Sequence, residues 1–233
     1  MSLKKYIPNL FTLLNLFSGC IALVFVSKEH YSLVFFFVCL GIFFDFFDGF
    51  FARLLKVQSP LGVQLDSLAD MVTSGVVPGY VMYNMIKNIP DTPEFLPYAG
   101  FIITLGSCYR LAKFNIDTRQ TDSFIGLPTP ANALFFVSLP LINESFYDDN
   151  FSGVVFPLWL LLVLIVLSAY VLNAEIPLFS LKIKSFRFEK YKLQIFFLIL
   201  SLAFLVLLNI AAIPLIILSY ILLSLIFRPK SES

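Results

Sequence analysis

Four aspartates lie within or beside long apolar stretches, and their spacing suits them to bind cations. Asp45 and Asp48 are three residues apart, and Asp66 and Asp70 are four apart. In a helix, either spacing puts both carboxylates on one face. A charge at membrane depth costs about 2.5–3.5 kcal/mol on insertion scales, so such a residue normally has a partner or a task. Two facing helices would gather four carboxylates, whose hard oxygens suit Mg²⁺, Mn²⁺ or Ca²⁺.

The spacing alone leaves three interpretations open. The first is metal-assisted chemistry at a cluster of carboxylates. The second is a cation or proton pathway in a transporter, where intramembrane acids also occur. The third is structural, with interhelical hydrogen bonds or with Arg53 or Lys56 as a counter-ion for the acids.

Small residues accompany the acids. Gly49 follows Asp48 directly, Ala52 lies one turn beyond it, and Gly62 precedes Asp66 by four residues. Glycine inside a helix costs about 1 kcal/mol relative to alanine, so its use there needs a reason. One reason is a side-chain-free patch where a flat group can approach the backbone. Close packing between helices is the other, and both can hold at once.

Composition indicates a polytopic membrane protein. Of the 233 residues, 59% are hydrophobic and only 13% are charged, and the mean hydropathy is +0.89. A soluble domain would carry about 25% charged residues. Cys20, Cys39 and Cys108 lie in apolar segments without a CxxC pair, and His30 is the only histidine. Neither a zinc site, a disulfide framework nor a histidine-based mechanism is indicated.

Apolar segments long enough to cross a hydrocarbon core of about 30 Å predict an all-α transmembrane bundle. We expect eight of them, and the first should turn its polar residues toward protein. The fifth is short and rich in proline, and the last two read as a tight helical hairpin. The predicted spans are 7–27, 32–54, 61–86, 95–116, 128–144, 153–173, 191–209 and 211–228.

The distribution of basic residues predicts the orientation. With both termini in the cytoplasm, all of the 16 lysines and arginines except Lys28 and Lys87 lie on the inner side. This is the asymmetry that the positive-inside rule describes. It puts both aspartate pairs near the cytoplasmic face, on helices that the short 54–60 connection makes antiparallel neighbours.

The pattern Asp-x2-Asp-Gly-x2-Ala-Arg-x8-Gly-x3-Asp-x3-Asp is complete from Asp45 to Asp70. It resembles the signature of the CDP-alcohol phosphotransferases, membrane enzymes that move a phosphatidyl or similar group from a CDP-linked donor to an alcohol. Four further segments are similar to the phosphatidylserine synthase branch of that family. They are KYIPNLFT (5–12), LDSLADMVTSG (65–75), RLAKFN (110–115) and GLPTP (126–130). The resemblance covers roughly residues 4–172.

The resemblance implies roles for these positions. Asp45, Asp48 and Asp66 would hold a pair of Mg²⁺ or Mn²⁺ ions, and Asp70 would contribute to one of them and act as the general base. The residues implied to contact the nucleotide are Gly49, Ala52, Arg53 and Gly62. Asn9 and Thr12 could form hydrogen bonds with the cytosine, and polar contacts between helices are an equal alternative for these two residues.

The acceptor site is less defined by the sequence. Arg110 and Lys113 could anchor the carboxylate of serine or the lipid phosphate, or could simply snorkel at a helix end. Asn115, Thr73 and Ser74 are further candidates. The implied substrates are CDP-diacylglycerol and L-serine; glycerol 3-phosphate or an inositol phosphate is the near alternative, and a cation or proton transporter the distant one.

The remaining expectations concern organisation. Residues 1–173 would form a catalytic membrane domain, 174–190 a basic cytoplasmic loop, and 191–233 a transmembrane hairpin and tail. The basic residues around this loop, Lys182 to Lys192, suit anionic lipid rather than nucleic acid. We expect an integral protein of a prokaryotic cytoplasmic membrane, with its active site facing the cytoplasm and a homodimer possible.

Overall fold

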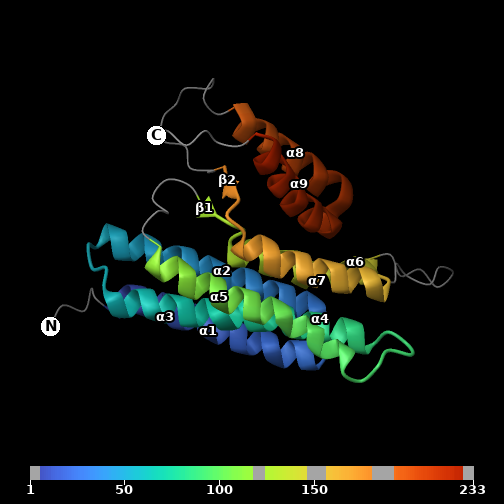
Figure 1. Cartoon of the computed structure of the whole chain (residues 1–233). Coiled ribbons are helices and arrows are strands. Elements are labelled where there is room, and N and C mark those ends of the chain that lie inside the picture. The colour runs from blue at the N-terminus through green and yellow to red at the C-terminus, as the bar shows by residue number, and fades with distance from the viewer. Residues whose placement is uncertain (1–5, 118–123, 146–155, 180–191, 228–233) are drawn as a thin grey trace.

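The computed structural model describes residues 6–117, 124–145, 156–179 and 192–227. These residues form a helical bundle, which confirms the predicted all-α fold (Figure 1). The described strands are two residues long: β1 (Phe124–Ile125) pairs antiparallel with β2 (Pro177–Leu178). The basic loop predicted at 174–190 falls largely outside the described residues.

The helices match the predicted apolar segments to within a few residues. They are α1 (Tyr6–Ser27), α2 (Tyr31–Leu54), α3 (Pro60–Asp70), α4 (Val77–Lys87), α5 (Ile102–Ile116), α6 (Thr129–Ser145), α7 (Leu158–Asn173), α8 (Lys192–Leu208) and α9 (Ala212–Ile226). The π-helical segment η2 (Met71–Val76) joins α3 to α4. Two 3₁₀ turns, η3 (Leu96–Phe101) and η5 (Asn209–Ala211), precede α5 and α9.

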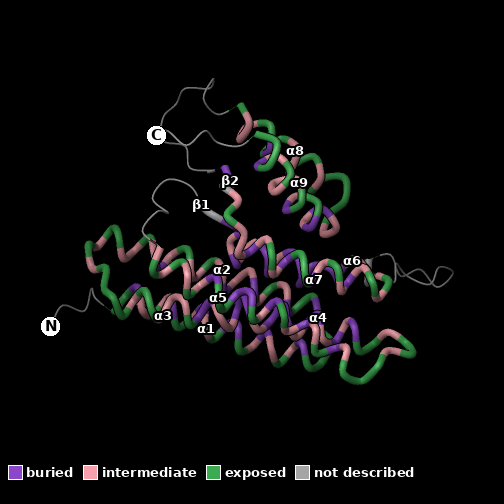
Figure 2. The backbone as a smooth tube through the Cα atoms, viewed as in Figure 1, coloured by how far each residue is buried: buried purple, intermediate pink, exposed green. Residues whose placement is uncertain are grey.

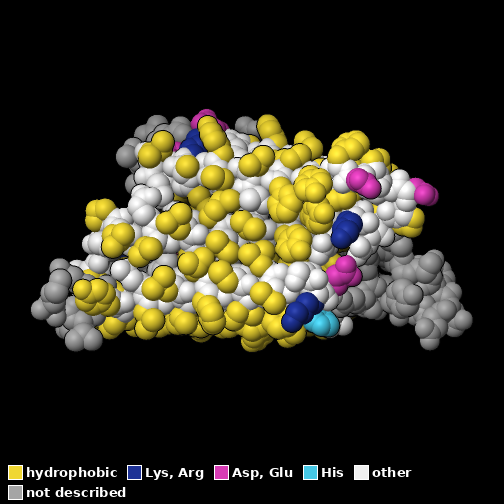
Figure 3. Space-filling model, turned by 90° about the horizontal axis from the view of Figure 1, so that it is seen from below, with side chains coloured by type: hydrophobic (Ala, Val, Ile, Leu, Met, Phe, Trp, Pro, Cys, Tyr) yellow, Lys and Arg dark blue, Asp and Glu magenta, His cyan; other side chains and the backbone are white. Residues whose placement is uncertain are grey.

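Length and hydropathy identify the protein as a membrane protein. Within the described ranges, three stretches are long and apolar enough to cross a bilayer: Tyr6–Ser27, Tyr31–Leu54 and Lys192–Ile226. Thr129–Ile142 and Leu158–Asn173 are apolar but shorter. Hydrophobic side chains cover most of the face seen in Figure 3, and charged ones gather toward its ends. The number of spans and the side on which the termini lie stay predictions.

The last two helices, α8 and α9, form a hairpin. The stretch Lys192–Ile226 turns back at η5, where Asn209 adopts a left-handed backbone with φ of 51°. The rings of Phe197 and Tyr220 meet across the hairpin with their centroids 5.6 Å apart. The Tyr220 hydroxyl also donates to the Phe179 carbonyl at 2.9 Å, which fastens α9 to the residue after β2.

The buried apolar residues form two clusters along the bundle (Figure 2). One joins α1, α2, α4 and α6 through residues such as Val26, Val38, Val81 and Val137. The other joins α4, α5, α6 and α7 to Ile217 of α9. The hairpin itself is mostly exposed or half-buried, so the other helices hold the larger share of the core (Figure 2).

The segment η2 packs unusually closely between α1 and α2. A Cβ atom added to Gly19 would collide with Thr73 Oγ1, and one added to Gly41 would lie 2.7 Å from Thr73 Cγ2. Thr73 is fully buried, and its hydroxyl donates to the Asn15 carbonyl at 3.1 Å. The widened π turn begins directly after Asp70, and such turns recur at functional sites.

Candidate metal and nucleotide site

Three of the four aspartates come together. Asp45, Asp48 and Asp66 each offer one carboxylate oxygen, and these three oxygens lie within 4.8 Å of one another. Asp48 is buried, while Asp45 and Asp66 are half-buried. Asp70 is also buried but lies outside this group of three. The structure therefore brings α2 and α3 together at the predicted acids, with Asp70 one turn further along α3.

The connection between the two helices explains this placement. α2 ends at Leu54, Lys56 reverses the chain with a φ of 55°, and α3 starts at Pro60. Ser59 caps α3 by accepting a hydrogen bond from the Gly62 amide at 3.1 Å. Proline at the first helical position and serine at the cap are both favoured at helix starts. The two helices leave this turn antiparallel, as predicted, and α1 packs against both (Figure 1).

Helix α1 holds two of the carboxylates. Thr12 Oγ1 donates to Asp48 Oδ2 at 2.6 Å, and Asn15 Nδ2 donates to Asp70 Oδ1 at 3.1 Å. Thr12, Asn15 and Ser18 are all buried, which confirms that the polar residues of the first helix face protein. Our sequence reasoning gave Asn15 no role at the acids. Its three-residue spacing from Thr12, on the same helix face, was the available signal.

The acids have no direct salt bridge to a basic side chain in the part of the chain that the structure describes. Among the described residues, no lysine or arginine nitrogen lies within 4.0 Å of a carboxylate oxygen of Asp45, Asp48, Asp66 or Asp70. The Arg53 guanidinium instead lies beside Gly49, with Nη1 3.5 Å from where a Cβ would stand. Neither Arg53 nor Lys56 therefore forms a salt bridge with these acids, whereas the interhelical hydrogen bonds of the structural interpretation are present at Asp48 and Asp70.

The donor set fits divalent cations. Two like charges 4.8 Å apart repel by about 3 kcal/mol at an effective dielectric constant of about 20. Three carboxylates at this separation need positive charge between them, and oxygen ligands are those that Mg²⁺ and Mn²⁺ prefer. The residues present thus match a divalent-metal site, and Asp45, Asp48 and Asp66 are the residues that would hold it.

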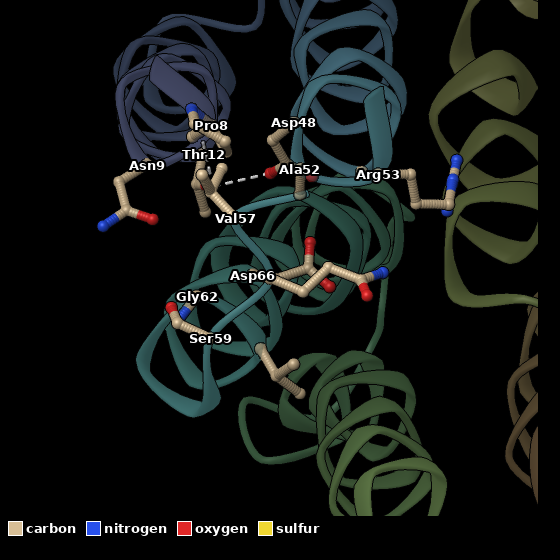
Figure 4. A pocket seen from close by; sticks show the side chains of 13 residues that line it. Pro8, Asn9, Thr12, Asp48, Ala52, Arg53, Val57, Ser59, Gly62 and Asp66 are labelled. Carbon is tan, nitrogen blue, oxygen red and sulfur yellow. Dashed lines mark hydrogen bonds between the residues drawn. The ribbon is translucent and has the colours of Figure 1, made fainter. Parts of the chain in front are cut away.

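A cavity adjoins the aspartates, and Figure 4 shows its lining. Its volume is about 130 Å³, or about 530 Å³ when the space at its open mouth is included. All six residues predicted to contact the nucleotide line it: Asn9, Thr12, Gly49, Ala52, Arg53 and Gly62. The sequence did not single out the other lining residues, which are Pro8, Val57, Gln58, Ser59 and Val63; Asp48 and Asp66 complete the lining.

The glycines of this cavity differ from those that pack helices together. The three atoms nearest to a Cβ on Gly49 all belong to the Arg53 side chain, at 3.5 Å or more. A Cβ on Gly62 would have the side chains of Ser59 and Asn9 nearest to it, at 3.3 Å or more. By contrast, a Cβ on Gly41 would stand 2.7 Å from Thr73 Cγ2. Helix packing therefore does not account for Gly49 and Gly62, whereas an open surface beside the acids does.

The predicted acceptor residues lie elsewhere. Arg110 is buried, and its Nε and Nη2 donate to the carbonyls of Leu127 and Gly126 at 2.9 and 3.4 Å. Lys113 forms a salt bridge of 3.8 Å with Glu175. These contacts tie α5 to the segments around β1 and β2, and neither residue lines the cavity beside the aspartates.

The remaining acceptor candidates are also engaged or enclosed. Asn115 Nδ2 donates to Ser67 Oγ at 2.9 Å and so joins α5 to α3. Thr73 is occupied by the Asn15 carbonyl, and Ser74 is fully buried with no hydrogen-bond partner for its hydroxyl among the described residues. The structure thus does not gather these candidates into one pocket with the aspartates.

Comparison with known proteins identifies the family. A family model described as CDP-alcohol phosphatidyltransferase matches residues 5–147, which include all four aspartates and the whole cavity lining. The chain belongs to the CDP-alcohol phosphatidyltransferase family. This confirms the resemblance seen in the sequence and the assignment as an enzyme. Helices α7, α8 and α9 lie beyond the matched residues.

Curated relatives narrow the comparison within this family. A CDP-diacylglycerol–serine O-phosphatidyltransferase of Helicobacter pylori is 29% identical over 197 residues, covering 83% of this chain and 78% of the relative. A protein of the same name from Bacillus subtilis is 36% identical, covering 58% of this chain and 75% of the relative. Another from Methanocaldococcus jannaschii is 32% identical, covering 66% of this chain and 70% of the relative.

Proposed function

We propose that this CDP-alcohol phosphatidyltransferase transfers phosphatidyl from CDP-diacylglycerol to L-serine, giving phosphatidylserine and CMP. The observation that carries the proposal is the convergence of Asp45, Asp48 and Asp66 beside a cavity lined by every residue predicted to contact the nucleotide. Serine is the acceptor because the relatives named above act on serine by name.

The aspartate triad would hold Mg²⁺ or Mn²⁺, and two such ions suit the number of carboxylates in the cluster. Bound divalent cations would offset negative charge on the donor's pyrophosphate. The chain's own part is to keep the ligands in place. Thr12 fixes one oxygen of Asp48 by its 2.6 Å hydrogen bond, and burial restricts the movement of that carboxylate further.

Asp70 would receive the proton of the attacking alcohol. Its Oδ1 accepts from Asn15, and Oδ2 has no hydrogen-bond donor among the described residues. In the reaction, the serine oxygen forms a bond to the phosphatidyl phosphorus, the bond from that phosphorus to the CMP oxygen breaks, and the serine proton passes to Asp70. The Asn15 amide would act as a positioning group that orients this carboxylate.

The cavity would hold the cytidine nucleotide of the donor. Gly49, Ala52 and Gly62 leave the helix surfaces beside the acids without large side chains, so a flat ring or a phosphate can approach the backbone. Asn9 and Thr12 supply polar atoms to the same space, and Arg53 supplies a positive charge near its edge. Holding the reacting groups in line next to fixed charges would supply most of the rate enhancement.

The charge asymmetry supports an orientation with the site facing the cytoplasm, since both aspartate pairs then lie near that face. The membrane would be a prokaryotic cytoplasmic membrane. Residues 1–173 would form the catalytic domain and 191–233 an added hairpin and tail. Arg110 and Lys113 would reach the acceptor only by leaving their present partners. A homodimer remains part of the proposal.

The test uses purified protein, CDP-diacylglycerol, a divalent salt and one alcohol at a time. We expect CMP release with serine and little with glycerol 3-phosphate or inositol phosphate. Release with inositol phosphate but not with serine would overturn the acceptor assignment. Cation flux in proteoliposomes without any CMP release would instead favour the transporter.

A further inference from the structure

A second cavity lies between α6, α7 and α9, away from the residues that line the nucleotide cavity. It measures about 650 Å³ with its mouth included, and its walls include Phe135 and Phe136 of α6 and Ile217 and Ile221 of α9. The contributing helices are apolar stretches of a membrane protein. The apolar walls are those of a site for a small hydrophobic ligand or one chain of a lipid.

One buried amide lines this cavity and lacks a partner. Asn132 is only 2% exposed, and its Oδ1 accepts from Ser168 Oγ at 2.7 Å. Its Nδ2 has no hydrogen-bond acceptor among the described residues. Since an unpaired buried donor is unfavourable, an occupant that brings an acceptor oxygen would satisfy it.

The mouth of the cavity opens on the outer surface of the bundle. Leu167 of α7 and Leu218 of α9 line the cavity and are 51% and 41% exposed. On apolar helices of a membrane protein, such side chains face lipid. An occupant can therefore enter sideways from the bilayer rather than from water.

These features select among the possible occupants. Water needs about two to four polar partners, and the Asn132–Ser168 pair supplies the polar side chains of this cavity. A helix of another protein would present carbonyls that its own backbone already engages. We propose that the cavity binds one acyl chain of a glycerophospholipid, with an ester carbonyl accepting a hydrogen bond from Asn132 Nδ2.

This assigns a task to the C-terminal hairpin, because α9 supplies one wall of the site. The same chemistry could come from two sources, the CDP-diacylglycerol donor or the bulk phospholipid of the membrane. The inference does not depend on the proposed reaction, since chain binding is measured without turnover.

The experiment uses the full-length protein in vesicles of phosphatidylethanolamine and phosphatidylglycerol that contain phosphatidylglycerol with a photoactivatable diazirine in the acyl chain. After irradiation, we expect cavity residues such as Phe135 and Ile221 to be labelled several-fold more than Val206 and Leu207, which are 73% and 75% exposed on α8. Equal labelling of the two groups would overturn the proposal.

Matched variants test the amide and the space separately. Asn132→Leu should reduce the cavity label about tenfold, as expected for one lost hydrogen bond, while Ser168→Ala should retain it because Nδ2 is untouched. Leu164→Phe, which fills the cavity, should also reduce the label, whereas Val163→Phe on the exposed face should not. If Asn132→Leu fails to fold, the second pair decides; wild-type labelling in Leu164→Phe overturns the proposal.

Competition identifies the source of the chain. If the site holds the donor, an excess of unlabelled CDP-diacylglycerol displaces the label and an equal excess of phosphatidylglycerol does not. If the site holds membrane lipid, phosphatidylglycerol displaces it as well. Displacement by neither lipid contradicts a saturable acyl-chain site.

Discussion

The hydrogen bond from Thr12 to Asp48 links the first helix to the proposed metal site, and Thr12→Val is the most selective way to remove it. Valine keeps the shape of threonine, so the buried packing around residue 12 is preserved. The lost bond is short, 2.6 Å, and its acceptor is a buried carboxylate. Hydrogen bonds to charged groups contribute about 1.5–3 kcal/mol, so removing it should lower kcat/KM by roughly ten- to a hundredfold.

The assay measures CMP release at several Mn²⁺ concentrations. Because Thr12 orients a proposed metal ligand, we expect the half-saturating Mn²⁺ concentration to rise along with the loss of kcat/KM. Ser18→Ala is the matched control: Ser18 is buried on the same helix, but its hydroxyl bonds only the Leu14 carbonyl of its own helix, at 2.8 Å. A Thr12→Val protein with wild-type kcat/KM and wild-type Mn²⁺ dependence would refute this reasoning.

Two further predictions concern residues with contrasting surroundings. Gly49→Ala and Gly62→Ala should raise the KM for CDP-diacylglycerol several-fold without lowering thermal stability, because their added methyl groups enter the cavity. Gly41→Ala should lower thermal stability, because its methyl group would press on Thr73. Equal losses of stability in all three variants would contradict this distinction. Arg110→Lys should lower thermal stability with little change in the KM for serine, since lysine cannot make both bonds to the Gly126 and Leu127 carbonyls; a large rise in the serine KM at unchanged stability would return Arg110 to the acceptor site.

The clustering of the aspartates and the lining of the adjacent cavity were predictable because they depend on local spacing. Asp45 and Asp48 share a helix face by their separation, and a short connection forces the next helix to return beside them. Gly49, Ala52 and Gly62 follow from the same geometry. A pattern that fixes eight positions within 26 residues carries both the chemistry and the family.

Long-range contacts were beyond such reasoning. The partner of Asp70 is Asn15, 55 residues away, and that of Asn115 is Ser67, 48 residues away. Arg110 reads as an anchor for an anion, but it bonds carbonyls around the turn at Gly126, whose φ of 76° suits glycine. A basic residue at a helix end does not reveal by itself whether its partner is substrate or backbone.

The C-terminal hairpin illustrates another limit. Its length and its turn at Asn209 could be predicted from hydropathy and from the polar interruption. Its relation to the bundle could not, because an all-round apolar helix has no preferred face. Only the fold places Ile217 and Ile221 opposite Asn132, where together they enclose a cavity.

The most direct test of the aspartate site is CMP release from CDP-diacylglycerol and serine after EDTA treatment, followed by stepwise addition of Mn²⁺, in wild-type protein and in Asp66→Asn. We expect EDTA to abolish CMP release and Mn²⁺ to restore it in the wild type. Asp66→Asn should stay inactive or need at least a hundredfold more Mn²⁺, since the variant loses one charged carboxylate from the group of three. Release that survives EDTA, or an Asp66→Asn protein with the wild-type Mn²⁺ response, would contradict the assignment of these carboxylates.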